Sequence, residues 1–173
     1  MKTRVILSAA GSDRPGLTKA LAEAVHGAGG NWLESHLSRL GGRYVGSVLV
    51  ELDGSDLAAF ESAIRAVDAS GLAVSLVPAG EEPPLAGELL RLELVGQDRP
   101  GIVREVTAVL AELGVNIEDF TTTTENGAWS GERLFRAAAR LNVPPGATSG
   151  QVRDALEAIS GEIMVDFSFG GSG

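Results

Sequence analysis

The 173-residue sequence predicts an α+β fold made of two similar domains in tandem. The main observation is an internal repeat, because Asp13-Arg14-Pro15-Gly16 returns 85 positions later as Asp98-Arg99-Pro100-Gly101, and the same shift carries Asn31 to Asn116. The second observation is that both halves pass through strand-like and helix-like patterns in the same order. A repeat at a fixed spacing indicates a duplicated structural unit, and here each unit has the size of a small domain.

Hydrophobic periodicity predicts the first strand and the first helix of each half. Alternating apolar residues predict a strand over residues 3–10, and the second half repeats the alternation over residues 90–94. After the Asp-Arg-Pro-Gly turn the period becomes helical, with Asp expected at or before the cap and Pro in the first helical turn. Gly29 and Gly114 are expected to end these helices in a left-handed conformation. The predicted apolar stripes are Leu17, Leu21, Ala24, Val25 and Ala28, and Ile102, Val106, Val109, Leu110 and Leu113.

The rest of each half predicts two strands, a second helix and a last strand. Gly41-Gly42 between two strand-like runs is a pair typical of a tight hairpin. The second hairpin is expected to be longer by about six residues near 124–129. The expected elements are strands at 31–39, 43–52 and 72–77 with a helix at 57–67, and strands at 115–125, 132–143 and 163–169 with a helix at 152–159.

The order strand-helix-strand-strand-helix-strand, found twice, is the ferredoxin-like pattern. Right-handed crossovers are expected to place both helices of a half on one face of its sheet. The sequence therefore predicts domains at residues 1–79 and 88–169. Residues 80–87 are expected to form a linker because of their Gly, Glu and Pro content, and residues 170–173 a disordered tail.

The composition disfavours several classes of function. The formal net charge is −9 and the basic residues form no cluster, which argues against direct binding of DNA or RNA. The absence of cysteine excludes disulfides, thiolate metal sites and cysteine nucleophiles. No stretch reaches the ~20 apolar residues of a membrane span, and residues 1–10 are interpreted as a strand rather than a signal peptide. We expect a soluble protein in the cytoplasm.

The repeated turn has two possible roles. We name residues 13–16 the first turn and residues 98–101 the second turn. A helix that begins at such a turn presents unpaired backbone N–H groups and the positive end of its dipole, which suit a carboxylate, and Gly allows close approach. The side-chain amides of Asn31 and Asn116 could contact the ammonium group of the same ligand. The alternative is that the turn only caps its helix.

With these residues, the chain resembles the ACT domain family, and more narrowly the tandem ACT proteins of the glycine cleavage system transcriptional repressor group. The resemblance extends over about residues 3–168. The two turns are moderately specific for the family, whereas the stretch 31–35 and the Gly-Gly hairpin at 40–46 indicate the narrower group. The second half carries the corresponding segments 114–117, 134–135 and 141–144, with Gly131 between the strands.

The resemblance implies a ligand site between paired ACT units, formed by the turn and the start of the second strand. The two copies differ at Ser12 and Gln97, and at Gly30 and Val115, so two equivalent sites are not assured. The ligand-binding residues implied by the resemblance are Ser12, Asp13, Pro15, Gly16 and Asn31, with Gln97, Asp98, Pro100, Gly101 and Asn116.

These observations predict a non-catalytic, amino-acid-binding regulatory protein without metal or cofactor. Glycine is the ligand suggested by the resemblance, and a protein partner would carry the regulation to transcription or to a metabolic enzyme. The hairpin around residues 126–131 is the candidate mobile element, since ligand binding shifts an equilibrium only through differential affinity. Pairing of ACT units is expected, either between chains as a homo-oligomer or between the two halves of one chain, because exposed sheet edges are a liability.

Other functions remain as alternatives. The chain could be a ligand-free interaction scaffold, or a detached regulatory subunit of an enzyme of amino-acid or one-carbon metabolism. Intrinsic catalysis is not expected, because no nucleophile has a base beside it and no carboxylates are paired. His26 and His36 are interpreted as surface or packing residues rather than metal ligands. RNA binding on the sheet is disfavoured by the acidic balance and by Leu92 and Leu94.

Overall fold

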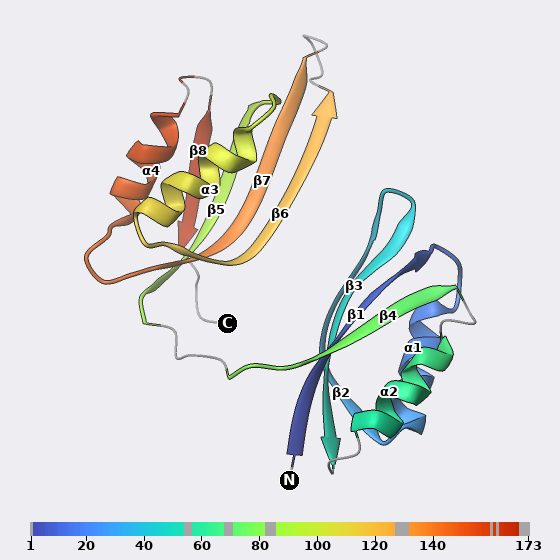
Figure 1. Ribbon diagram of the computed structural model, residues 1–173. Coiled ribbons are helices and arrows are strands. Elements are labelled where there is room, and N and C mark those ends of the chain that lie inside the picture. Colours follow the sequence, from blue (N-terminus) through green and yellow to red (C-terminus); the bar gives the residue numbers. More distant parts are fainter. Residues whose placement is uncertain are drawn as a thin grey trace. The chain divides into compact units, whose positions relative to one another are not determined.

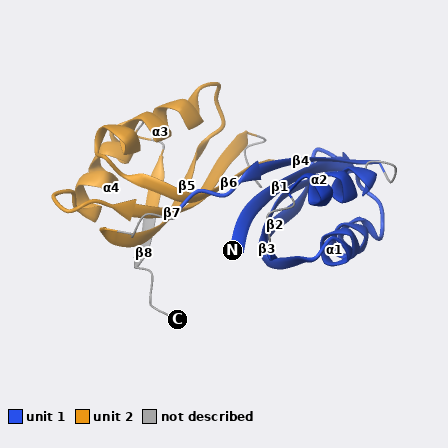
Figure 2. Ribbon diagram, turned by 60° about the horizontal axis from the view of Figure 1, so that its bottom comes forward, with its two compact units in different colours: residues 1–82 blue, residues 83–173 orange. Residues whose placement is uncertain are grey.

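The computed structural model describes residues 2–53, 57–67, 71–81, 86–126, 132–159, 161 and 163–169. The chain divides into two compact units, Met1–Glu82 and Pro83–Gly173, here the first and the second unit (Figure 2). The division falls inside the segment 80–87, where the sequence places a linker. Residues 82–85 of that segment, the hairpin residues 127–131 and the tail 170–173 lie outside the described residues.

The first unit is an antiparallel four-stranded sheet with two helices on one face (Figure 1). The strand order is β2-β3-β1-β4, so the strand that opens the chain lies inside the sheet. This is the predicted βαββαβ order, and the prediction is confirmed. The elements are β1 (Lys2–Ser12), α1 (Leu17–Gly27), β2 (Gly30–Leu40), β3 (Arg43–Asp53), α2 (Leu57–Arg65) and β4 (Leu72–Pro78).

The second unit repeats this architecture. Its sheet has the order β6-β7-β5-β8, and its two helices again cover one face (Figure 1). The α+β, ferredoxin-like fold predicted for both halves is therefore present twice. The elements are β5 (Glu88–Gln97), α3 (Ile102–Glu112), β6 (Asn116–Asn126), β7 (Arg133–Val143), α4 (Ser149–Glu157) and β8 (Met164–Phe169).

Each unit has its own core between the sheet and the helices. In the first unit the alternate residues of β1 point to the helices, and the predicted stripe of α1 meets them. In the second unit β5 and α3 do the same. Burial of these side chains is the main term that stabilises a fold of this size. The paired core residues are Val5, Leu7, Ala9, Leu17, Leu21 and Val25, and Leu90, Leu92, Leu94, Ile102, Val106 and Leu110.

The helices begin differently from the sequence expectation. α1 starts at Leu17, and its N-cap is Gly16 at φ 92°, so Pro15 precedes the cap instead of lying in the first turn. Gly101 at φ 91° caps α3 in the same way, and no side chain caps either helix. The left-handed glycine redirects the chain, and this conformation disfavours any residue with a Cβ. The expected Asp cap is therefore wrong.

The ends of these helices and the first hairpin agree with the prediction. Gly29 at φ 76° follows the C-cap of α1, and Gly114 at φ 68° follows that of α3. Gly41 and Gly42 both have positive φ, as the tight turn between β2 and β3 requires.

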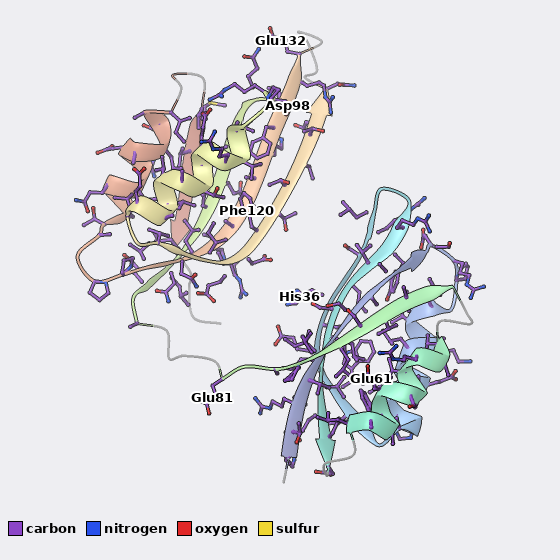
Figure 3. All side chains as sticks on the ribbon, in the orientation of Figure 1. His36, Glu61, Glu81, Asp98, Phe120 and Glu132 are labelled. Carbon is purple, nitrogen blue, oxygen red and sulfur yellow. The ribbon has the colours of Figure 1, made fainter. Side chains whose placement is uncertain are left out.

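A β-bulge near the start of β2 recurs in β6, and the sequence did not predict it. The register shifts between Trp32 and Glu34 in the first unit and between Ile117 and Asp119 in the second, which are equivalent positions. A bulge puts two residues opposite one, so every later residue of the strand changes face. Leu37 thereby packs against the core, and His36 lies on the face away from the helices (Figure 3).

Candidate functional site

The first turn lies where β1 ends, beside the tip of the β2–β3 hairpin. Ser12 is paired with Arg43 across the sheet, and the Arg43 Nη1 atom donates to the Ser12 hydroxyl at 3.4 Å. The Asp13 carboxylate is 3.0 Å from Nε of Arg39, which comes from β2. The carboxylate expected to cap the helix is thus used to hold the turn against the hairpin.

The second turn is held in the same way but by a different arginine. Asp98 Oδ2 lies 3.5 Å from Nε of Arg133, and the Asp98 amide donates to the Arg133 carbonyl at 2.8 Å. Asp98 is found at the end of the sheet near Glu132 (Figure 3). The position equivalent to Arg39 is Thr124, whose hydroxyl accepts from Arg133 at 3.0 Å. Because the two arginines come from non-equivalent positions, the duplication did not copy this ion pair.

The glycines of the two turns serve the backbone. A Cβ built on Gly16 meets no atom within 4 Å, and one on Gly101 meets only the Glu105 side chain, at 3.9 Å. The positive φ is therefore the reason for glycine, more than the space around it. Neither helix has a side-chain cap on its first N–H groups, although the Ile102 N–H at the start of α3 donates to the Arg99 carbonyl at 3.3 Å.

Side chains around the two turns are less alike than the backbone. Beside the first turn, the hydroxyls of Thr18 and Tyr44 share a hydrogen bond of 2.6 Å. Beside the second turn, Arg99 Nη1 donates to Glu105 Oε1 at 2.8 Å, and Nη2 donates to the other carboxylate oxygen. This Arg99 contact is the main cause that lowers the pKa of the Glu105 carboxyl. Sequence analysis did not single out Thr18, Tyr44 or Glu105.

Asn31 lies at the opposite end of the first unit. It is paired with Glu51 of β3, which in turn is paired with Arg4 near the start of β1. Lys2 Nζ lies 2.6 Å from Glu51 Oε1, and this contact lowers the pKa of Glu51 and raises that of Lys2. Asn31, Glu51, Lys2 and His26 line an open surface cavity of about 390 Å³.

The turn and the asparagine of one unit therefore do not share a site. Ser12 and Arg4 stand at opposite ends of β1, and at about 3.3 Å per residue these positions are about 26 Å apart. In the second unit Gln97 is paired with Leu134, whereas Asn116 lies at the other end of the same sheet. A site that uses both features must take its asparagine from another ACT-type unit.

Asn116 has a polar neighbour that the sequence analysis missed. Its Nδ2 atom donates to Glu118 Oε1 at 2.5 Å, and it is paired across the sheet with Asn142 of β7. Asn142 is 9% exposed, and among the described residues its Oδ1 atom is buried without a hydrogen-bond partner. Leu141, Asn142 and Val143 are all buried, which breaks the alternation of β7, whereas the sequence alternates apolar, polar and apolar there and carries no signal of this burial.

The described ranges contain neither a cluster of metal-ligating side chains nor a helix suited to span a membrane. No group of three or more His, Cys, Asp or Glu side chains there could hold a metal ion. His36 contacts Glu34 at 3.1 Å on the exposed face of β2. Among these same residues, no helix combines the length and the apolar character needed to cross a membrane.

Comparison with known proteins gives the same result for both units. Two family models of the ACT domain match the chain, one over residues 3–75 and the other over residues 90–145. A crystal structure of an unknown protein from Galdieria sulphuraria is 30% identical, with a TM-score of 0.83 over 98% of this chain and 99% of that one. No curated protein sequence matches.

A second solved structure is similar in fold. It is that of a proposed glycine cleavage system transcriptional repressor, 16% identical, with a TM-score of 0.71 over 98% of this chain and 99% of that one. At this identity the likeness concerns the fold alone.

Proposed function

Because the chain belongs to the ACT domain family, we propose that it is a non-catalytic regulatory protein of the cytoplasm that binds a small amino acid at its Asp-Arg-Pro-Gly turns. The observation that carries the proposal is the pair of helix N-termini with glycine caps, whose N–H groups no side chain caps. Such an end attracts a carboxylate through its free donors and its dipole. The ion pairs Arg39–Asp13 and Arg133–Asp98 support it, because they hold each turn in one position.

The ammonium group of the ligand requires acceptors. The side-chain oxygen of Asn31 or Asn116 and backbone carbonyls are suitable. Since each asparagine lies about 26 Å from the turn of its own unit, by the strand rise, the complete pocket needs a second ACT unit. The proposal therefore includes pairing of ACT units, and the ligand would strengthen it by contacting both members.

Regulation would pass through a partner protein. The formal net charge of −9 disfavours direct contact with DNA, so any effect on transcription requires an intermediary. Glycine is the first ligand to test, because a structure of similar fold is that of a proposed glycine cleavage system transcriptional repressor. The target, whether a transcription factor or a metabolic enzyme, would respond to the ligand-dependent contacts of this protein.

A second candidate function is a ligand-free scaffold. It is favoured by the same ion pairs, because Asp13 and Asp98 are satisfied inside the chain and need no ligand. In this case the turns would only connect strand to helix, and the exposed sheet edges would provide the contacts with other proteins.

Calorimetry of the full chain with a panel of amino acids, glycine included, distinguishes the two. The proposal expects saturable heat with at least one of them at millimolar concentration or below. Thr18→Glu, in the first turn of α1, is expected to weaken binding at this helix because it adds a negative charge where the carboxylate arrives. An acidic residue near a helix N-terminus favours the fold, so lost binding would not reflect unfolding.

The matched control is Ala22→Glu, on an exposed position one helical turn further along α1. The control adds the same charge away from the N–H groups and should bind as the wild type does. Absence of heat with every amino acid, together with unchanged self-association, would favour the scaffold.

A further inference from the structure

The two turns have matching backbones and different chemical surroundings. Their glycine caps differ in φ by one degree, 92° against 91°. Three side-chain positions around them have changed; two are matched by the repeat spacing of 85 residues, and the third by its place in the sheet, opposite Gly11 in one unit and Gly96 in the other. Ala20 corresponds to Glu105, Thr18 to Val103 and Tyr44 to Phe135.

The second turn already holds a carboxylate. Glu105 lies in the first turn of α3, and its two oxygens accept from both terminal nitrogens of Arg99. Glu105 Oε1 is 3.9 Å from the position that a Cβ on Gly101 would take. A carboxylate bound in this two-pronged way, beside the positive end of a helix, combines the two interactions that an anionic ligand would use.

The first turn lacks this internal carboxylate. Arg14 is exposed, and among the described residues it has no ion-pair partner. The residue at the place of Glu105 is Ala20, which cannot reach an arginine. Thr18 and Tyr44 present hydroxyls next to the helix end, whereas Val103 and the buried Phe135 offer none. The first turn thus has a free guanidinium and two hydroxyls where the second has a closed ion pair and hydrocarbon.

We infer that the first turn alone takes the ligand carboxylate, and that Glu105 fills the equivalent place at the second turn. This inference rests on the proposed function and specifies it: one ligand per chain, bound through its carboxylate at Arg14 and the N-terminus of α1. An external carboxylate at the second turn must displace a tethered one, whose effective concentration is on the order of millimolar or above.

Exchange of one residue between the repeats tests the inference. Amide NMR of the full chain is recorded during titration with glycine and, separately, with sodium acetate against a sodium chloride control. In the wild type we expect shifts at Gly16, Leu17 and Thr18 and none above the chloride control at Gly101 to Val103. Glu105→Ala should open the second turn to acetate, and Ala20→Glu should reduce the response of the first turn at least tenfold in apparent affinity.

The control variant is Glu105→Gln, which keeps the size of the side chain and removes its charge. It should also admit acetate at the second turn, since the inference depends on the carboxylate and not on bulk. All variants change half-buried or exposed positions, and their melting temperatures verify that they fold.

The outcomes separate this inference from the proposed function. Equal responses at both turns in the wild type, or a second turn that stays silent in Glu105→Ala, would overturn the inference while amino-acid binding stands. Binding of no amino acid removes the proposed function, and the acetate titration then decides whether the two turns differ. No acetate response at the first turn also overturns the inference.

Discussion

The first and second units agree where the fold constrains them and differ where it does not. Their bulges occupy equivalent places, Trp32/Glu34 and Ile117/Asp119, and both leading helices begin at a left-handed glycine. In contrast, the arginine that holds the turn comes from β2 in one unit and from β7 in the other. Backbone geometry has few solutions, so it was kept through the duplication. A surface ion pair can be built from several positions.

The sheet faces away from the helices show the same divergence. In the first unit Ile6 of β1 stands between Leu49 of β3 and Val77 of β4, so this part of the face is apolar. In the second unit the corresponding Arg91 is paired with Arg140, and the face there is charged. The cores remain nearly interchangeable while these faces are not. We therefore expect the two units to differ in function at the positions where their side chains differ, and the surroundings of the turns are among these positions.

Truncation of the core should have the largest effect and should treat the two units alike. Leu7 and Leu92 are equivalent and at most 1% exposed. We expect Leu7→Ala and Leu92→Ala each to lower the free energy of unfolding of their own unit by about 2–5 kcal/mol, because the lost burial leaves a cavity. Native-state hydrogen exchange, which assigns the loss to one unit, is the measurement. Leu40→Ala, at a side chain 70% exposed, is the control; a large loss there would contradict this account.

Substitution of the glycine inside the first strand of each unit is expected to destabilise the two units unequally. A Cβ on Gly11 would lie 2.4 Å from the Gly71 carbonyl oxygen, whereas one on the equivalent Gly96 would meet the Ile163 side chain at 3.1 Å. Backbone cannot move away as a side-chain carbon can. Gly11→Ala should cost about 1–3 kcal/mol of unfolding free energy and Gly96→Ala clearly less. Denaturant unfolding of both variants gives the order, and equal losses would show that the two surroundings relax alike.

Substitution of the two capping glycines is expected to destabilise both units equally, and by less than the core substitutions do. Gly16→Ala and Gly101→Ala place a Cβ on a residue at φ near 90°, with no close contact in either case. The penalty is conformational, about 1–2 kcal/mol for each unit. Chemical denaturation of the two variants measures it. A loss well above this range in one unit would reveal a steric role of that glycine.

A lower pH is expected to have the smallest effect on stability, and to act on the two units through different residues. Arg99 holds the pKa of Glu105 below its usual range, so this pair stabilises the second unit above the usual carboxyl pKa. The contribution is lost as the pH falls through the lowered pKa. In the first unit Lys2 has the same effect on Glu51, far from the turn. Glu105→Gln should flatten the acid dependence of hydrogen exchange in the second unit only, and Glu51→Gln in the first unit only.

A change of both profiles by Glu105→Gln would contradict the assignment. Neither pair is expected to contribute much at neutral pH, because exposed ion pairs are weak and are screened by salt. The pH profile, rather than the stability at one pH, is therefore the informative quantity.

The sequence allowed the fold to be predicted in detail. The repeat of residues 13–16 at 98–101, the alternating strands and the helical stripes gave the order of elements, and Gly41-Gly42 gave the hairpin. These signals are local, because each depends on the spacing of neighbours along the chain. The repeated turns were also identified from the sequence as the points where a strand leads into a helix. The predicted capping roles of Asp13 and Pro15 were wrong. Cap preferences describe only residues close in sequence, whereas Asp13 forms an ion pair with Arg39 of another strand.

The sequence by itself determined two ferredoxin-like units, since hydrophobic period and glycine position act within a few residues. Only the tertiary structure decided which residues meet. Arg39 and Arg133 contact equivalent aspartates of the two units from non-equivalent strands, and Arg99 contacts Glu105. Asn31, in contrast, lies far from the turn of its own unit. The physical reason is that register, bulges and strand order are set by the packing of the whole sheet. A one-residue shift in any of them would bring other side chains together.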